Sequence, residues 1–84
     1  DEEQINIKYN FDGENKQVTI RIFDFGMNLV KTIIQNANRP GGLDNIDYWN
    51  GRDENNNIVP NGVYFFRIDI GDNEQSYGKI MVLM

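Results

Sequence analysis

The sequence predicts an all-β domain that folds as an antiparallel sandwich, and its composition and patterning lead to this fold class. The 84 residues include eleven isoleucines, five valines, five phenylalanines and four tyrosines, against one alanine and three leucines. β-Branched and aromatic residues favour strands, whereas alanine and leucine favour helices. Short segments of alternating apolar and polar residues recur along the chain, separated by clusters of Gly, Asp and Asn. This is the pattern of strands joined by turns.

Two strands are expected near the start of the chain. Apolar residues occupy every second position over Ile5–Phe11, which predicts a strand with one buried face. Asp12 and Gly13 open the polar turn that follows. The second strand, Val18–Ile22, shows the same alternation.

A third strand, Leu29–Ile34, is expected to form a hairpin with the second. The connection Asp24–Asn28 is short, and either Gly26 or Asn28 is expected to adopt a positive φ angle within it. The apolar residues of Leu29–Ile34 fall on both faces of the strand. This implies either a bulge or burial on both sides.

The middle of the chain is expected to be mostly loop. Gln35–Asn45 is rich in Asn and interrupted by Pro and Gly, which predicts an irregular segment. A short strand is expected at Ile46–Trp49. The next segment, Arg52–Asn61, is polar and is predicted to be another loop.

The last two strands are expected to pair with each other. Alternation resumes at Gly62 and continues to Ile70, a turn is expected over Gly71–Gln75, and Tyr77–Met84 forms the final strand. Strands at this spacing predict an immunoglobulin-like sandwich of about seven strands. Its core is expected to contain Ile20, Ile22, Trp49, Tyr64, Phe66, Ile68 and Val82.

Residues 1–84 are expected to form one domain, because a chain of this length can build one core and not two. The chain opens on acidic residues rather than on a methionine. We therefore interpret it as a piece of a larger protein, and the final strand, which runs to Met84, leads us to expect that the piece comes from the C-terminus of that protein.

Composition excludes several kinds of chemistry. The chain has no cysteine, no histidine and a single serine, Ser76, which excludes disulfides, thiol or imidazole catalysis and typical zinc sites. The net charge is −5, and the eight Lys and Arg residues are scattered singly. Nucleic acids and anionic membranes attract clustered positive charge, so neither is an expected partner. Membrane insertion is not expected either, since no apolar run approaches the roughly 20 residues of a span. No cofactor is expected.

Four segments occur in the order found in a known family: Val18–Asp24, Leu29–Ile33, Trp49–Asp53 and Asn61–Ile68. With these segments, the chain resembles the FlgD-type immunoglobulin-like domain, named after the flagellar hook-capping protein, over residues 5–84. Relatives of this module occur at the C-termini of large secreted and cell-surface bacterial proteins, including many that look like type IX secretion cargo. The resemblance implies a non-catalytic sandwich that brings no set of catalytic residues.

The chain differs from the family pattern at two positions. Met27 stands where the first hairpin of the family usually has a glycine, and Asn50 stands where an aspartate usually follows the tryptophan. The Pro-rich opening and the basic tail typical of type IX sorting domains are also absent from this sequence.

Trp49 has two interpretations. As the only tryptophan, it is expected to fill the small core, where one large ring buries more surface than any other side chain. The alternative is a carbohydrate-binding platform that Tyr48, Phe65 and Tyr77 would extend. Tyr64, just after Asn-Gly at the start of a strand, is expected to form a tyrosine corner by donating a hydrogen bond to upstream backbone.

The segment Asp53–Asn57 has oxygen-bearing side chains like those of a calcium loop. Such a loop also needs a glycine at its sixth position and a carboxylate at its twelfth. Those positions are Ile58 and Tyr64, so we predict a polar turn here and no metal site.

The sequence favours a structural or interaction module over an enzyme. Val63, Phe65 and Arg67 share the strand face opposite to the core residues, and are a candidate contact face. The expected partners are neighbouring domains of the parent protein or cell-surface components, in an extracellular or cell-surface bacterial location. A carbohydrate-binding module is the alternative function.

Overall fold

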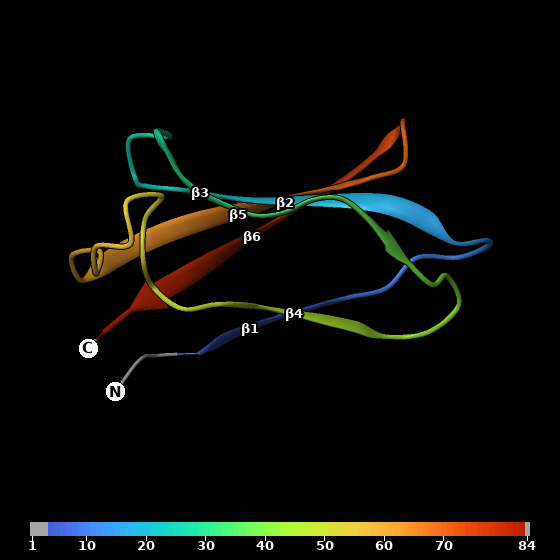
Figure 1. Cartoon of the computed structure of the whole chain (residues 1–84), viewed down its shortest axis with the longest axis horizontal. Helices are drawn as coiled ribbons and strands as arrows, with labels where there is room; N and C mark the ends of the chain where they lie inside the picture. The colour runs from blue at the N-terminus through green and yellow to red at the C-terminus, as the bar shows by residue number, and fades with distance from the viewer. Residues whose placement is uncertain (1–3, 84) are drawn as a thin grey trace.

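The computed structural model describes residues 4–83, which contain six strands and no helix (Figure 1). No helix in this range could therefore cross a membrane. The strands are β1 (Ile5–Tyr9), β2 (Lys16–Phe23), β3 (Leu29–Arg39), β4 (Asn45–Trp49), β5 (Gly62–Ile70) and β6 (Glu74–Val82). Every pairing between them is antiparallel.

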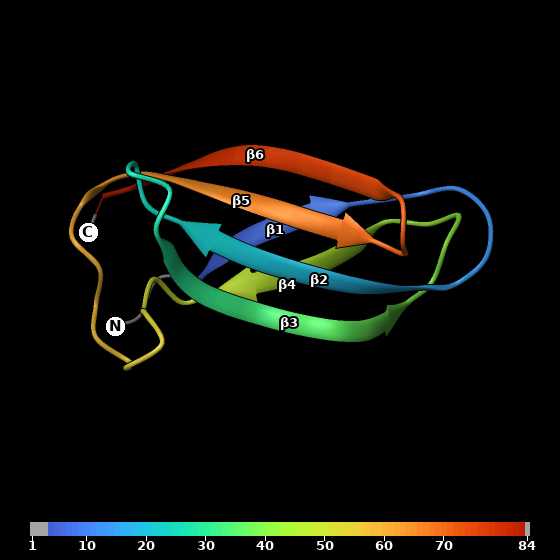
Figure 2. The ribbon, with the colours of Figure 1, turned by 90° about the horizontal axis from the view of Figure 1, so that it is seen from above.

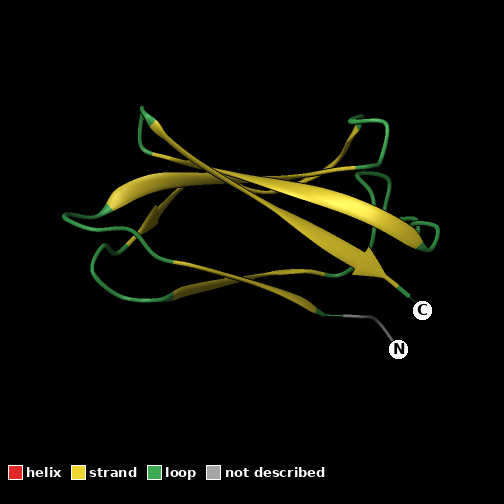
Figure 3. Ribbon diagram, turned by 180° about the vertical axis from the view of Figure 1, so that it is seen from behind, coloured by secondary structure: helices red, strands yellow, loops and turns green. Residues whose placement is uncertain are grey.

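The strands form two layers (Figures 1 and 3). One is a four-stranded sheet in the order β3-β2-β5-β6, and the other is the pair β1-β4, which lies beneath the larger sheet in the view from above (Figure 2). The predicted all-β, immunoglobulin-like antiparallel sandwich is confirmed. Residues 4–83 form six strands, one fewer than the expected number of about seven. Between β4 and β5 the chain has too few apolar residues for another strand and forms only an isolated bridge between Arg52 and Ile58.

Several strand ends differ from expectation. β2 begins two residues earlier and ends one residue later than expected, and β4 begins one residue earlier. Gln35–Arg39 was predicted to be loop. These residues instead continue β3, because they pair with the first half of β2. β6 begins at Glu74 rather than Tyr77, so the turn is shorter than expected. β1 ends at Tyr9. The expected strand end at Met84 lies outside the described residues.

Bulges explain why the apolar residues of β3 fall on both faces. β3 has 11 residues and pairs with the 8 residues of β2, and the register between the two strands shifts in three places. One shift lies near Asn36, which has a φ of 52° and whose amide donates to Thr19 Oγ1 at 3.0 Å. Bulges add residues to one strand and bend it. Of the two alternatives, the structure therefore shows the bulge.

The core lies between the two sheets. Its buried apolar residues are Ile7, Tyr9, Phe11, Val18, Ile20, Ile22, Trp49, Val59, Tyr64, Ile68, Ile70, Ile80 and Val82. These include every residue predicted for the core except Phe66, which is only partly buried. The ring of Phe66 lies across Gly78 on the edge strand β6, where a Cβ atom would overlap it. This places the ring at an open side of the sandwich, and the expectation that it is buried is wrong.

Trp49 is the largest fully buried side chain, with 1 % of its surface exposed. Its ring meets Tyr64 edge-on, with 5.5 Å between the ring centroids. The indole Nε1 donates to the carbonyl oxygen of Arg52 at 2.9 Å. Tyr64 in turn donates its hydroxyl to the carbonyl oxygen of Pro60 at 2.7 Å, which is the geometry of a tyrosine corner. The two aromatic rings thus join the core to both ends of the loop between β4 and β5.

Trp49→Ala is expected to lower the free energy of unfolding by about 3–5 kcal/mol, the usual loss for a large buried aromatic residue. A domain of this size is stable by only about 5–10 kcal/mol, so much of the variant should be unfolded at 37 °C. Urea unfolding followed by circular dichroism measures the loss. A variant that unfolds within about 0.5 kcal/mol of the parent would contradict the core role, since that range is typical of surface substitutions.

A polar cluster connects the two sheets at one side of the core. The Tyr9 hydroxyl on β1 donates to Asp47 Oδ2 at 2.6 Å. Arg39 at the end of β3 donates to both oxygens of the same carboxylate, at 3.2 Å and 2.7 Å. Asp47 is 8 % exposed. Although burial opposes its ionisation, the hydrogen bonds from Arg39 and Tyr9 hold the pKa of Asp47 below its ordinary value. Burial, followed by the bond to Asp47, raises the pKa of Tyr9.

Asp47 should make folding sensitive to acid. Because its pKa is lower in the folded state, its ionisation stabilises the fold above about pH 4, and that stabilisation is lost as the pH falls through the folded pKa. We expect Asp47→Asn to cost about 2 kcal/mol at pH 7 through the loss of charge-assisted hydrogen bonds. The difference from the parent should shrink below about pH 3. Equal acid sensitivity of both proteins in urea unfolding would contradict this role.

The turn between β2 and β3 places its positive φ angle at an unexpected residue. Met27 N donates to Asp24 O at 2.9 Å, and Asp24 N donates to Asn28 O at 3.0 Å. Met27 has a φ of 65°, whereas Gly26 and Asn28 do not have positive φ angles. The prediction of Gly26 or Asn28 is wrong, because a three-residue hairpin loop requires the left-handed conformation at its last residue.

Met27→Gly is expected to stabilise the domain by about 1 kcal/mol, because glycine adopts this conformation without strain. Met27 is 59 % exposed, so little packing is lost. Met27→Ala keeps the strained backbone and is the matched control, for which no gain is expected. Thermal unfolding of both variants measures the difference, and equal melting temperatures would show that the strain is absent.

Candidate functional site

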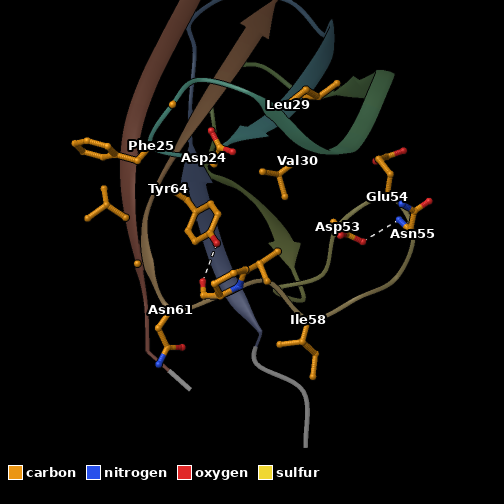
Figure 4. A pocket seen from close by; sticks show the side chains of 15 residues that line it. Asp24, Phe25, Leu29, Val30, Asp53, Glu54, Asn55, Ile58, Asn61 and Tyr64 are labelled. Carbon is orange, nitrogen blue, oxygen red and sulfur yellow. Dashed lines mark hydrogen bonds between the residues drawn. The ribbon is translucent and has the colours of Figure 1, made fainter.

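A groove of about 590 Å³ (Figure 4) lies at the end of the sandwich that also holds both ends of the described chain (Figure 1). It is bounded by the turn 24–28, the start of β3, the loop 53–61 and the start of β5. The loop is held against β3 by backbone, since Glu54 N donates to Val30 O at 3.1 Å. The tyrosine corner of Tyr64 fixes its other end at Pro60.

The three carboxylates of the groove are engaged by backbone amides. Asp53 Oδ1 accepts from the amides of Asn55 and Asn57, at 2.9 Å and 3.0 Å. Glu54 Oε1 accepts from the amide of Thr32 at 2.8 Å. Asp24 Oδ1 accepts from the amide of Asn28 at 2.9 Å, and this bond lowers the pKa of Asp24. Their common role is to hold turns in shape.

This arrangement explains the pattern at Asp53–Asn57 that looks like a calcium loop. The Asp53 carboxylate caps a tight turn, and its amide donates to Asn57 O at 2.9 Å. Asn56 supplies the positive φ of the turn, at 66°. Residues 4–83 contain no group of three or more Asp or Glu side chains placed to hold a metal ion.

The rim of the groove is apolar and exposed. Phe25 is 75 % exposed, Ile58 60 % and Leu29 53 %, and all three line the groove (Figure 4). Met27 lies in the same turn as Phe25 and is also exposed. We call Phe25, Met27, Leu29 and Ile58 the apolar rim. Exposed apolar residues that gather around a groove mark a surface that contacts another molecule.

Only part of the predicted contact face, which consists of Val63, Phe65 and Arg67, lies next to the apolar rim. Val63 lines the groove, and Phe65 lies beneath Phe25, with 6.2 Å between the ring centroids. Arg67 lies further along β5, where Nη2 pairs with Asp69 Oδ2 at 3.1 Å. Arg21 on β2 pairs with the same oxygen at 3.1 Å. Val63 and Phe65 therefore adjoin the groove, whereas Arg67 belongs to a separate polar cluster.

The aromatic residues of the carbohydrate alternative are not brought together. Trp49 is buried in the core. Tyr48 lies on β4 in the smaller sheet, whereas Phe65 and Tyr77 lie on β5 and β6 in the larger one. Trp49 cannot serve as a stacking platform, and Tyr48 lies in the other sheet from Phe65 and Tyr77, so the four rings do not form one surface.

Sequence reasoning missed the apolar rim because three of its four residues, Phe25, Met27 and Ile58, lie in segments that were predicted to be turns or loops, and Leu29 is the first residue of a predicted strand. The available signal was the presence of Phe25 and Met27 in a five-residue connection, and of Ile58 in an Asn-rich loop. The alternation of apolar and polar residues along strands does not predict whether large apolar residues in turns and loops are buried or exposed.

Comparison with known families agrees with the fold and with the motif geometry. A sequence model of the FlgD Ig-like domain matches residues 1–74. This chain belongs to that family. The match covers most of the chain but ends where β6 begins, short of the expected span 5–84. The comparisons with curated proteins and with solved structures found no match.

Membership of the FlgD Ig-like domain family agrees with the structural use of its motif residues here. Asn50, where an aspartate is usual, accepts from the amide of Arg52 through Oδ1 at 3.1 Å. Gly51 has a φ of 76° and accepts from Val59 N at 3.0 Å. The segment Trp49–Asp53 thus shapes the loop beside the groove, and the family to which the chain belongs is one of non-enzymatic Ig-like modules.

Proposed function

We propose that this chain is an accessory module of an exported bacterial protein, located at the C-terminus of that protein and serving attachment or spacing. Its apolar rim and groove dock against a neighbouring domain of the parent protein or a cell-surface component. The observation that carries the proposal is the gathering of Phe25, Leu29 and Ile58 around one groove at a single end of the sandwich.

The position of the groove supports a neighbouring domain as the partner. Both ends of the described chain lie at the same end of the sandwich as the groove (Figure 1). A domain connected through either end would reach this surface over a short distance. Interfaces between domains of one chain need only a moderate area, which is compatible with a small apolar patch.

The chemistry of the groove also favours a protein surface as its occupant. Its carboxylates are committed to backbone amides, so the exposed groups left for contact are mostly apolar. The export and C-terminal position of the module are supported by the family, whose namesake belongs to the flagellum, and by the resemblance to secreted proteins. A sorting role would require recognition of this module by an export system.

Phe25→Ser in the full-length parent protein is expected to weaken docking, because a central aromatic contact contributes about 2 kcal/mol to an interface. Hydrogen exchange measured by mass spectrometry should show residues 24–30 and 53–63 protected in the parent relative to the isolated module. Phe25→Ser should reduce that protection. Tyr77→Ser removes another exposed ring, 66 % exposed against 75 % for Phe25, from β6 and is the matched control.

Deletion of the module tests the accessory role itself. The parent protein without residues 1–84 should keep its activity and lose attachment to its surface or its correct location. Equal hydrogen exchange of the groove in the parent and in the isolated module would contradict docking. Lost activity in a folded, correctly exported remainder would contradict the accessory role.

A further inference from the structure

A second hollow, of about 520 Å³, lies on the side of the sandwich between β1 and β6. One wall is the end of β1, with Lys8, Tyr9 and the following Asn10, and the other is the first half of β6, Glu74–Tyr77. Core-facing residues of β5, including the partly exposed Phe66, line it as well. This side differs from the end that carries the apolar rim.

Both sheets end on this side in a strand whose outer edge is free. β6 is the edge of the four-stranded sheet, and β1 is one edge of the two-stranded sheet. No further strand of residues 4–83 pairs with the outer edge of either. Free edges expose rows of backbone donors and acceptors that can pair with another strand.

The opposite edge of the larger sheet is protected. β3 carries the three register shifts, and the loop after β4 covers it through Glu54, which bonds to Val30 O and to the amide of Thr32. Bulges and covering loops are the usual protection of sheet edges. β6 has neither, and pairs with β5 in unbroken register from Gly62–Val82 to Ile70–Glu74. It also contains no proline.

We propose that the outer edge of β6 binds an extended peptide of another protein, which adds to the larger sheet as a further strand. The peptide would place apolar side chains at alternate positions into the hollow, where they cover Phe66. The peptide must be extended in order to pair with the backbone edge of β6. It must carry apolar side chains in order to pack against Phe66, Ile68 and Ile70, which line the hollow.

The charges at the hollow are already paired, which favours an uncharged inward face on the peptide. Lys8 pairs with Asp44 at 3.4 Å, and Glu74 pairs with Lys16 at 3.8 Å. A second copy of this chain would bring a further net charge of −5, which opposes association. We therefore favour a separate peptide over self-pairing.

The experiment titrates the ¹⁵N-labelled chain with a capped peptide of about six residues, in which valine and threonine alternate and one terminal lysine provides solubility. Two control peptides carry N-methyl groups on alternate residues, one in each of the two frames. Saturable NMR shifts and slowed hydrogen exchange are expected over residues 74–82. One methylated frame should abolish them, because it removes the donors that face β6, and the other frame should retain them.

The protein variant Ser76→Lys tests whether the hollow receives the side chains of the peptide. Ser76 is exposed and lines the hollow, so the substitution should leave folding intact while it places a charge where the peptide needs apolar surface. We expect peptide binding about tenfold weaker, a loss of about 1.4 kcal/mol. Asn73→Lys adds the same charge in the turn before β6 and should bind the peptide like the parent.

Three results would overturn the proposal. They are the absence of saturable shifts at millimolar peptide, equal binding of both methylated frames, and shifts confined to the apolar rim. Sedimentation showing that the chain pairs with itself through residues 74–82 would assign the edge to a second copy instead. The first two results and self-pairing do not bear on docking at the apolar rim, whereas shifts confined to the rim would overturn only the edge proposal, so the two proposals fail separately.

Discussion

The burial of Trp49 is the constraint on which the rest of the structure depends. Its ring occupies the space between the sheets, and its single polar atom must find an acceptor, which is the carbonyl oxygen of Arg52. That bond fixes the chain immediately after β4. The edge-on contact with Tyr64 places a second ring whose hydroxyl holds Pro60. Two core residues therefore determine both ends of the loop that forms the groove.

The groove results from the way this loop is held in place, and not from an arrangement of reactive side chains. The loop meets β3 through Glu54 and stays rigid through the Asp53 turn. An oxygen of each carboxylate of the groove is engaged by backbone amides, and Phe25, Leu29 and Ile58 are the exposed apolar side chains that line the groove. A module whose polar groups hold its own loops, and whose exposed groups are Phe25, Leu29 and Ile58, suits contact with another protein surface better than catalysis.

The sandwich is closed on one side and open on the other. On the closed side, Arg39 of β3 reaches Asp47 of β4, while Tyr9 of β1 reaches the same carboxylate. On the open side, β1 and β6 face each other across a hollow. Two strands cannot cover a sheet of four, so one side must remain incompletely covered. Phe66 is partly exposed for that reason, and Gly78 provides the space for its ring.

The sequence by itself determined the fold class, the family and the burial of the residues predicted for the core other than Phe66. Period-two alternation in β2 and β5 identifies buried faces because side-chain direction is a local property of a strand. The tyrosine corner was also predictable, since it depends on residues only four positions apart. Tertiary structure alone decided the bulges of β3, the partial exposure of Phe66 and the gathering of the apolar rim around one groove. Each of these arises where segments distant in sequence meet, and no local pattern specifies which segments those are.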